Sequence, residues 1–162
     1  MDEAKMIMLY FAYGSNMDWN EMRGCCPSAK FVAIARFADR ILKFTRRSKN
    51  RDCGVADVVF EKSRDVWGVV YEVPDTEIGF LDFKEGFRPG RENMKNSYMR
   101  EEHHVFLDST KEKPLTVSVY VGNPELDPPL PNQAYKDLII RGAKNWHLPD
   151  AYIQSLNEIK VV

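Results

Sequence analysis

The chain has 162 residues and a formal net charge of -1, and 44% of its residues are hydrophobic and 12% aromatic. This length fits one domain, and a domain of this size buries roughly 70% of the surface that its unfolded chain exposes. The balanced charge argues against a dedicated nucleic-acid or membrane-surface protein, because such proteins usually carry a strong basic bias. We therefore expect a single domain over residues 1–162 with no nucleic-acid or membrane partner.

Targeting and cysteine patterns narrow the class further. No segment approaches the ~20 apolar residues of a transmembrane helix, and the apolar stretch 6–13 follows Asp2 and Glu3 instead of the basic start of a signal peptide. The three cysteines contain no CxxC pair, which argues against a zinc site. Adjacent Cys25 and Cys26 can form a strained vicinal disulfide, but reduced thiols are the favoured interpretation. These features predict a cytoplasmic protein that holds no metal.

Apolar and alternating segments predict seven strands. The first, at 6–12, is short and continuously apolar, and it runs into a polar turn at 13–16. The other six segments predict strands at 31–37, 40–45, 55–61, 66–73, 98–107 and 115–121. We expect the first two of these six to join through a turn at Asp39, and the next two to join through the polar residues 62–65.

Helices are expected at four places. Asp18 is placed to cap a short helix that follows it, and two helices close the chain at about 133–146 and 149–160. The remaining helix begins near Pro74 and ends at Gly86. Many strands with few, segregated helices indicate an α+β fold, in which a mixed, mostly antiparallel and barrel-like sheet carries a few flanking helices.

Glu85 is a candidate proton-transfer group at the end of this middle helix. It lies four residues after Leu81 and so points to the same side of the helix as this core residue. Phe80, Phe83 and Phe87 are close in sequence and are expected to help wall the carboxylate off from water. Burial raises a carboxyl pKa, and the partial negative charge of a helix end acts in the same direction. The alternative is an ordinary solvated glutamate at a helix end.

The turn after the first strand is a candidate anion-binding site. Gly14 permits a positive φ and close approach of the backbone to a ligand, and successive N–H groups at a helix start attract anions. Ser15 and Asn16 add side-chain hydrogen bonds. The alternative is an ordinary strand-to-helix turn. An anion-binding turn together with a desolvated carboxylate suggests an enzyme that acts on a small amino-acid-like substrate.

Three other polar features have less specific interpretations. Asp82 lies one turn before Glu85 and either raises the pKa of Glu85 by repulsion or orients the loop. The basic run 46–51 is interpreted as a solvated hairpin loop in preference to a contact with nucleic acid or with an anionic substrate tail. The acidic and histidine side chains at 101–104 alternate between two faces of a strand, so they do not form a metal site.

Several motifs follow one another along nearly the whole chain. They include YGSN at 13–16 after the first strand, VWGVVY at 66–71, LDFKEG at 81–86, and GAK at 142–144 with LP at 148–149. Each motif is short, but the ordered set resembles the gamma-glutamylcyclotransferase family, whose fold is also called AIG2-like.

The resemblance implies a mixed α/β fold built around a small barrel. It also implies the conversion of a gamma-glutamyl amino acid to 5-oxoproline and the free amino acid, a reaction that requires no metal or other cofactor. The catalytic glutamate of the family maps to Glu85. The substrate-binding positions of the family map to Tyr13, Gly14, Ser15, Asn16, Met17, Tyr98 and Tyr135. Relatives further suggest a homodimer.

Two other functions are compatible with the same residues. The same chemistry can act on a gamma-glutamylamine or a gamma-glutamyl-capped metabolite, with Arg88, Arg91 and Glu92 of the long loop 87–97 selecting the substrate. A second alternative is a non-catalytic small-molecule-binding module of the same fold. The presence of Glu85 favours an enzyme over this binding module.

Overall fold

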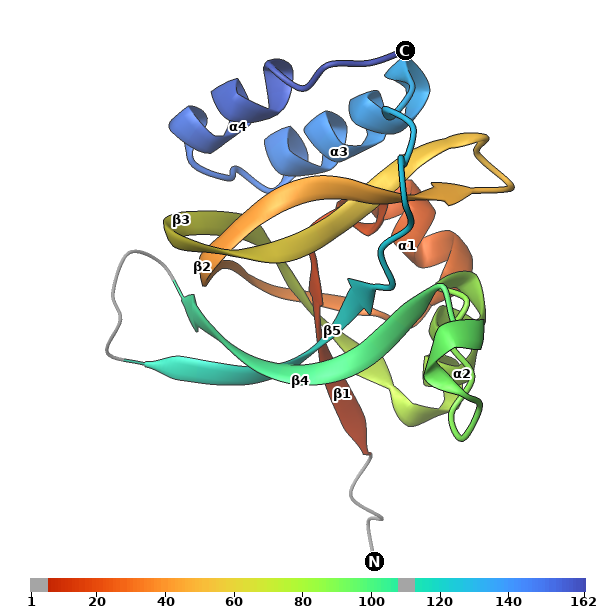
Figure 1. Cartoon of the computed structure of the whole chain (residues 1–162). Coiled ribbons are helices and arrows are strands. Elements are labelled where there is room, and N and C mark those ends of the chain that lie inside the picture. The colour runs from red at the N-terminus through yellow and green to blue at the C-terminus, as the bar shows by residue number, and fades with distance from the viewer. Residues whose placement is uncertain (1–5, 108–112) are drawn as a thin grey trace, which may run out of the picture.

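A computed structural model describes residues 6–107 and 113–162. In this part of the chain, five strands close into a barrel in the order β1-β3-β2-β4-β5 (Figure 1). The strands are β1 (Ile7–Ala12), β2 (Lys30–Ser48), β3 (Cys53–Pro74), β4 (Tyr98–Leu107) and β5 (Pro114–Gly122). Neighbours are antiparallel, except that β1 and β5 pair in parallel at Tyr10 and Ser118. The predicted α+β fold with a mostly antiparallel, barrel-like sheet is confirmed.

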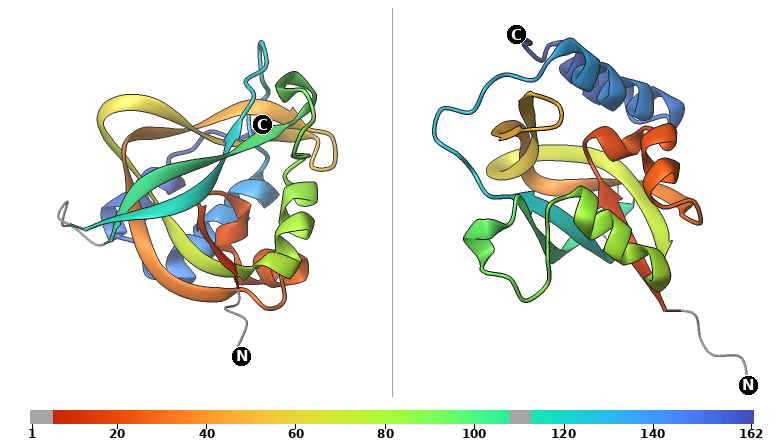
Figure 2. Two further views of the ribbon diagram at one scale, coloured as in Figure 1. Left: turned by 90° about the horizontal axis from the view of Figure 1, so that it is seen from below. Right: turned by 90° about the vertical axis from the view of Figure 1, so that its right-hand side faces the viewer.

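Helices flank the barrel on separate sides. Figures 1 and 2 show two helices near the end of the chain side by side on one side of the barrel, and a helix from the middle of the chain on another side. The helices are α1 (Trp19–Cys25), α2 (Asp75–Lys84), α3 (Gln133–Asn145) and α4 (Asp150–Asn157), and the 3-10 turns are η1 (Ser15–Met17) and η2 (Asn93–Lys95).

The strands β2 and β3 form one long hairpin that reverses at residues 49–52. The predicted turns at Asp39 and at 62–65 are therefore wrong. Asp39 and Ser63 instead have left-handed φ values of 56 and 68, and the N–H of Ser63 donates to Asp39 Oδ1 at 2.9 Å. Short polar residues tolerate this conformation, and the pairing register shifts next to Asp39. A bulge that bends a continuous strand thus produces the same sequence signal as a turn.

The expected helix boundaries near the site are confirmed. The Asp18 carboxylate accepts a hydrogen bond from the Glu21 N–H at 3.1 Å and caps α1. Helix α2 begins directly after Pro74, and Gly86 has a φ of 64 just after the helix ends. A side chain at Gly86 would also lie 2.7 Å from Ser97 Oγ. The helix end that carries Glu85 is therefore held in one place.

The described residues also bear on the expectations about membrane-spanning segments and cysteines. No helix within 6–107 and 113–162 is long and apolar enough to cross a membrane. The three cysteines are free thiols, and the Sγ atoms of Cys25 and Cys26 lie 3.7 Å apart. In this structure the two sulfur atoms are therefore not bonded to each other.

Candidate active site

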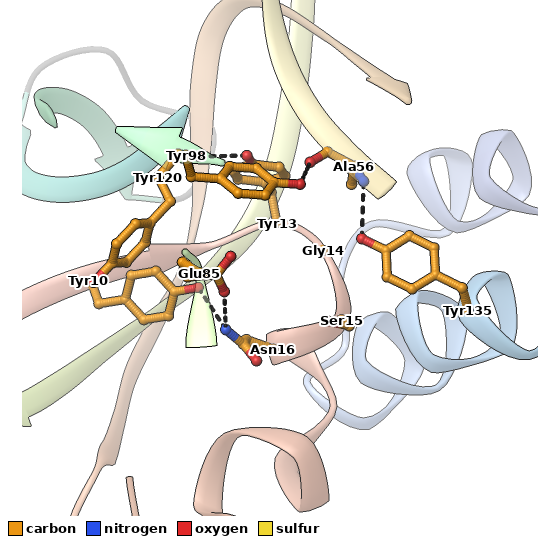
Figure 3. A pocket seen from close by; sticks show the side chains of 10 residues that line it. All are labelled: Tyr10, Tyr13, Gly14, Ser15, Asn16, Ala56, Glu85, Tyr98, Tyr120 and Tyr135. Atoms are coloured by element: carbon orange, nitrogen blue, oxygen red, sulfur yellow. Dashed lines mark hydrogen bonds between the residues drawn. The ribbon is translucent and has the colours of Figure 1, made fainter. Parts of the chain in front are cut away.

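Glu85 lies where α2 ends and faces a small cavity inside one end of the fold. Its N–H donates to the carbonyl of Leu81 at 3.0 Å, so the backbone still follows the helix at this position. Figure 3 shows its carboxylate surrounded by the residues that line this inner cavity. The inner cavity is lined by Tyr10, Tyr13, Gly14, Ser15, Asn16, Ala56, Glu85, Tyr98, Tyr120 and Tyr135.

A buried asparagine fixes the carboxylate of Glu85. Asn16 Nδ2 donates to Glu85 Oε1 at 2.9 Å and to the hydroxyl of Tyr10 at 3.0 Å. On its other side, Asn16 Oδ1 accepts a hydrogen bond from Lys84 Nζ at 2.7 Å. Because an ammonium group can only donate, Lys84 sets which way the Asn16 amide points. Asn16 is 3% exposed, so little water competes for these bonds.

The pKa of Glu85 is raised above its ordinary value, as predicted. Burial is the main cause, while the charge of Lys84, the hydrogen bond from Asn16 and the charge of Arg51 act in the opposite direction. The residue still has some exposed surface, because it also lines a wider groove outside the inner cavity. Glu85 therefore combines a desolvated carboxylate with an open route to solvent.

Asp82 does not face Glu85 as a free negative charge. Arg100 Nη1 donates to both carboxylate oxygens of Asp82, at 2.8 and 2.7 Å, and the hydroxyl of Tyr120 donates to Oδ1 at 2.6 Å. These bonds tie α2 to β4 and β5. Of the two sequence interpretations, the structure supports the one in which Asp82 orients its surroundings.

The walls of the inner cavity differ from those expected. Phe80 and Phe83 are 62% and 87% exposed, so they do not shield the carboxylate of Glu85 from water. The shield consists instead of tyrosine rings from β1, β4, β5 and α3 and from the turn after β1. Neighbours in sequence on a helix point in different directions, whereas the strands bring distant residues to one place.

Some of the tyrosine hydroxyls in the cavity donate a hydrogen bond to the protein, and others accept one. Tyr98 donates its proton to the carbonyl of Ala56 at 2.6 Å, whereas the hydroxyl of Tyr135 accepts the N–H of Ala56 at 2.9 Å (Figure 3). Tyr13 donates to the carbonyl of Tyr120 at 2.5 Å. Tyr135 therefore still has a proton to donate, and Tyr98 has only lone pairs left.

Tyr10 resembles Tyr135 in this respect. Its hydroxyl accepts from Asn16 and keeps its own proton for another acceptor. Burial raises the pKa of both tyrosines well above the ordinary value, with a further increase from the charge of Glu85. Both hydroxyls consequently stay protonated and can serve as donors.

Three of the lining residues, Tyr10, Ala56 and Tyr120, were not expected at the site. Tyr120 lies on the same face of β5 as Thr116 and Ser118, which are polar. An aromatic ring on a polar face is unusual, and this pattern could have marked Tyr120 as a candidate site residue. Tyr10 and Ala56 give no comparable signal, because an apolar residue in a buried strand is usually a core residue.

The turn after β1 reaches the cavity without a left-handed residue at Gly14. Gly14 has a φ of -113, so it does not use the positive φ that a glycine permits. Its missing side chain instead permits close packing, because a Cβ here would lie 3.3 Å from the hydroxyl of Tyr135 and 3.4 Å from the Cβ of Ala56. The first hydrogen bond of η1 runs from the N–H of Met17 to the carbonyl of Gly14, so the N–H groups of Ser15 and Asn16 precede it.

Met17 does not line the inner cavity, although it was expected at the substrate. Its side chain is fully buried, and its carbonyl accepts the indole N–H of Trp146 at 2.9 Å. Gly142 of α3 passes so close that a Cβ there would lie 2.4 Å from the carbonyl carbon of Met17. Together with the bond from Tyr71 to the carbonyl of Asn16 at 2.8 Å, this packing clamps the turn.

A wider groove, here called the outer groove, continues from the inner cavity to the surface. Ser15, Glu85, Tyr98 and Tyr135 line both spaces. The end of β2 and the turn 49–51 form a large part of its wall, so the basic run is not simply a solvated loop as the sequence suggested.

The long loop 87–97 contributes to the outer groove in an unexpected way. Arg91 binds within the loop, with Nε donating to Asn96 Oδ1 at 2.8 Å and Nη2 donating to the carbonyl of Gly86 at 3.1 Å. Neither Arg88, Arg91 nor Glu92 lines the groove, whereas Lys95 and Ser97 do. The proposed role of the first three residues in substrate selection therefore has no support in the geometry.

The described residues contain no group of three or more His, Cys, Asp or Glu side chains that could hold a metal ion. Within β4, His103 pairs with Glu101 at 2.9 Å, while His104 contacts Thr116 of β5 at 3.2 Å. The acidic and histidine side chains at 101–104 are therefore divided between different partners.

Comparison with known proteins agrees with this geometry. Residues 65–156, more than half of the chain, match the AIG2-like family. A mouse gamma-glutamylcyclotransferase is 35% identical over 158 residues, which cover 94% of this chain and 78% of the mouse protein. The chain belongs to the AIG2-like family, with the gamma-glutamylcyclotransferases. The bovine gamma-glutamylcyclotransferase is 33% identical over 157 residues, with the same coverage of both chains.

The likeness extends to the three-dimensional structure. A solved structure of a gamma-glutamyl cyclotransferase superposes with a TM-score of 0.86 and 28% sequence identity, covering 97% of this chain and 90% of the other. The family and fold predicted from the ordered motifs are thus confirmed, and the family is one of enzymes.

Proposed function

We propose that this member of the family converts gamma-glutamyl amino acids or related gamma-glutamyl amides to 5-oxoproline and a free amine, with Glu85 as the acid/base. The observation that carries the proposal is a single desolvated carboxylate, hydrogen-bonded to Asn16, at the junction of an enclosed cavity and an open groove. The likeness to named gamma-glutamylcyclotransferases over most of the chain supports the same reaction.

The reaction closes a five-membered ring within the substrate. The α-nitrogen forms a bond to the γ-carbonyl carbon, and the bond from this carbon to the leaving nitrogen breaks. The α-nitrogen starts as an ammonium and loses two protons, and the leaving amine gains them. Glu85 accepts each proton and passes it to the leaving nitrogen, so it acts first as a base and then as an acid. Since attacker and target share one molecule, holding the folded substrate supplies much of the remaining rate enhancement.

The hydroxyl groups suit different parts of the substrate. Tyr98 can only accept a hydrogen bond from a ligand, which fits the α-ammonium. Tyr10 and Tyr135 can donate, which fits the γ-carbonyl oxygen as it gains negative charge and the α-carboxylate. The N–H groups of Ser15 and Asn16 provide further donors for the carboxylate. The substrate-binding residues proposed here are Tyr10, Tyr13, Gly14, Ser15, Asn16, Tyr98 and Tyr135.

The test is 5-oxoproline formation from a panel of gamma-glutamyl amino acids and gamma-glutamylamines by the wild type, Glu85→Gln and the control Glu61→Gln. Glu61 is exposed on β3 and lines neither space. We expect Glu85→Gln to lose roughly a hundredfold to ten-thousandfold in kcat while it still folds and binds substrate. Binding without turnover by the wild type, unchanged in Glu85→Gln, would instead identify a non-catalytic module.

We also propose a cytoplasmic location and a homodimeric assembly. Three free thiols support a reducing compartment, and exposed apolar side chains such as Phe31 and Val32, each 40% exposed, support contact between copies. Light scattering on the purified protein would distinguish a dimer from a monomer, and fractionation of cells would test the location.

A further inference from the structure

The outer groove carries far more positive than negative charge. Its lining contains two carboxylates, Glu85 and Glu125, in a chain whose net charge is -1. The basic residues of the lining are Arg46, Arg47, Lys49, Arg51, Lys84 and Lys95. Long-range charge of one sign around a concave surface concentrates ligands of the opposite sign.

Three of these six cations pair closely with a carboxylate. Glu21 pairs with both Lys84 at 2.9 Å and Arg51 at 3.3 Å, so one negative charge serves two cations. Arg47 pairs with Asp52. These pairs hold the groove wall together and reduce the charge that they offer to a ligand.

The other three cations are less compensated. Arg46 is half-buried and donates from Nη1 to the carbonyl of Asn123 at 2.7 Å, and within the described residues it forms no salt bridge. Lys49 likewise has no salt bridge to a described residue. Lys95 approaches Glu92 only to 3.9 Å, with both side chains mostly exposed. A guanidinium held by one carbonyl retains other N–H groups for a bidentate contact with a carboxylate.

The groove begins at Glu85, beside which the proposed reaction places the scissile bond. Tyr135 lines both spaces, and the Arg51 guanidinium lies 5.2 Å from the centre of its ring. The positive charge of Arg46 partly offsets the burial that raises the pKa of Tyr98, so this charge is felt at the rim of the inner cavity. The outer groove spans about 1260 Å³ and the inner cavity about 300 Å³, and both volumes include open solvent. In the proposed reaction the γ-glutamyl part is directed toward the inner cavity, and the leaving amine is directed toward the larger outer groove.

We propose that the outer groove selects gamma-glutamyl compounds whose leaving amine carries two carboxylates, as a dicarboxylic amino acid does, with Arg46 as the main contact. This inference rests on the proposed function and names its substrate class. The cations surround the mouth of a catalytic cavity and do not form a stripe across a face, which favours a small dianion over nucleic acid.

The test compares two isosteric substrates, γ-glutamyl-glutamate and γ-glutamyl-glutamine, which differ by one negative charge. We expect kcat/KM to be roughly fivefold higher for the glutamate compound, because a partly exposed charge pair has a modest effect. This preference should weaken as salt is added, since salt screens exposed charges. The variant Arg46→Gln should lower kcat/KM for the glutamate compound more than for the glutamine compound and so abolish the preference. The control Lys43→Gln removes the same charge from an exposed position on β2 outside the groove and should keep the preference.

Calorimetric binding of both compounds to Glu85→Gln separates this inference from the proposed function. If the wild type releases no 5-oxoproline but Glu85→Gln binds the glutamate compound more tightly, the groove assignment stands and the proposed reaction fails. Equal kcat/KM and equal affinity for the two compounds would overturn the inference and leave the reaction intact. An equal loss on both substrates in Arg46→Gln, or Arg46-dependent binding of a short oligonucleotide without discrimination between the compounds, would also overturn it.

Discussion

The inner cavity and the outer groove meet at Glu85, but different kinds of side chain line them. Tyrosine rings and backbone groups surround the inner cavity, and Glu85 is its one carboxylate. Basic side chains at the ends of strands and in turns surround the outer groove. Burial on the inner side raises the pKa of Glu85, while the cations on the outer side, Lys84 and Arg51, act to lower it.

This contrast teaches how one carboxylate can be both basic and accessible. A carboxylate in an aromatic cavity is a stronger base than one in water. Burial alone would drive it toward the neutral form, and the nearby cations limit that shift without filling the cavity. We therefore place the proposed proton transfer on the desolvated side and the proposed recognition of charge on the solvated side.

The largest effect expected within the inner cavity, after loss of Glu85 itself, comes from Asn16→Ala. This change removes the hydrogen bonds to Glu85 and to Tyr10. A buried hydrogen bond to a charged group contributes about 1.5–3 kcal/mol, so we expect kcat/KM to fall roughly tenfold to a hundredfold.

Steady-state kinetics of Asn16→Ala beside Asn20→Ala measures this effect. Asn20 is exposed on α1 and serves as the control. Unchanged kcat/KM in a folded Asn16→Ala variant would show that the carboxylate needs no fixed orientation.

A smaller change is expected at the boundary between the two regions. Lys84 is the largest of the influences that lower the pKa of Glu85. In Lys84→Gln this pKa should rise further, so the acidic limb of the pH profile of kcat/KM should move to higher pH.

The pH profiles of the wild type, Lys84→Gln and the exposed control Lys62→Gln test this shift. An acidic limb that stays in place in Lys84→Gln would mean that Glu85 is not the group whose ionisation controls activity.

The smallest effect concerns stability. Because the pKa of Glu85 is higher in the folded protein than in the unfolded chain, its contribution to stability is fully present below the unfolded value. The contribution is lost as the pH rises through the folded value. Glu85→Gln has no such titrating group. Its free energy of unfolding minus that of the wild type should therefore increase as the pH rises from the unfolded to the folded pKa of Glu85. Above that range the difference should stay constant.

Urea unfolding of both proteins at a series of pH values provides the measurement. A difference that does not vary with pH would argue that the carboxylate is well solvated in the folded state.

Local sequence signals determined several parts of the site. Pro74 and Gly86 mark the two ends of α2. Proline before a helix and glycine after it can be recognised in the sequence, because both act through the local backbone conformation. The same holds for the turn at 13–16 and for the capping of α1 by Asp18. The spacing after Leu81 further predicted that Glu85 points inward. The ordered motifs then predicted the family and the barrel-like fold.

Only the tertiary structure decided what surrounds that carboxylate. Phe80 and Phe83 turned out to be exposed, Phe87 is half-buried and does not line the cavity, and tyrosines from β1, β4, β5 and α3 form the cavity wall. Within the described residues, two partners of the basic run lie far from it in sequence: Glu21 pairs with Arg51, and the carbonyl of Asn123 accepts a hydrogen bond from Arg46. Strand pairing and helix packing bring such residues together although they are far apart in sequence. The periodicity of the sequence predicts which face of an element is buried, but it does not predict which residues contact one another.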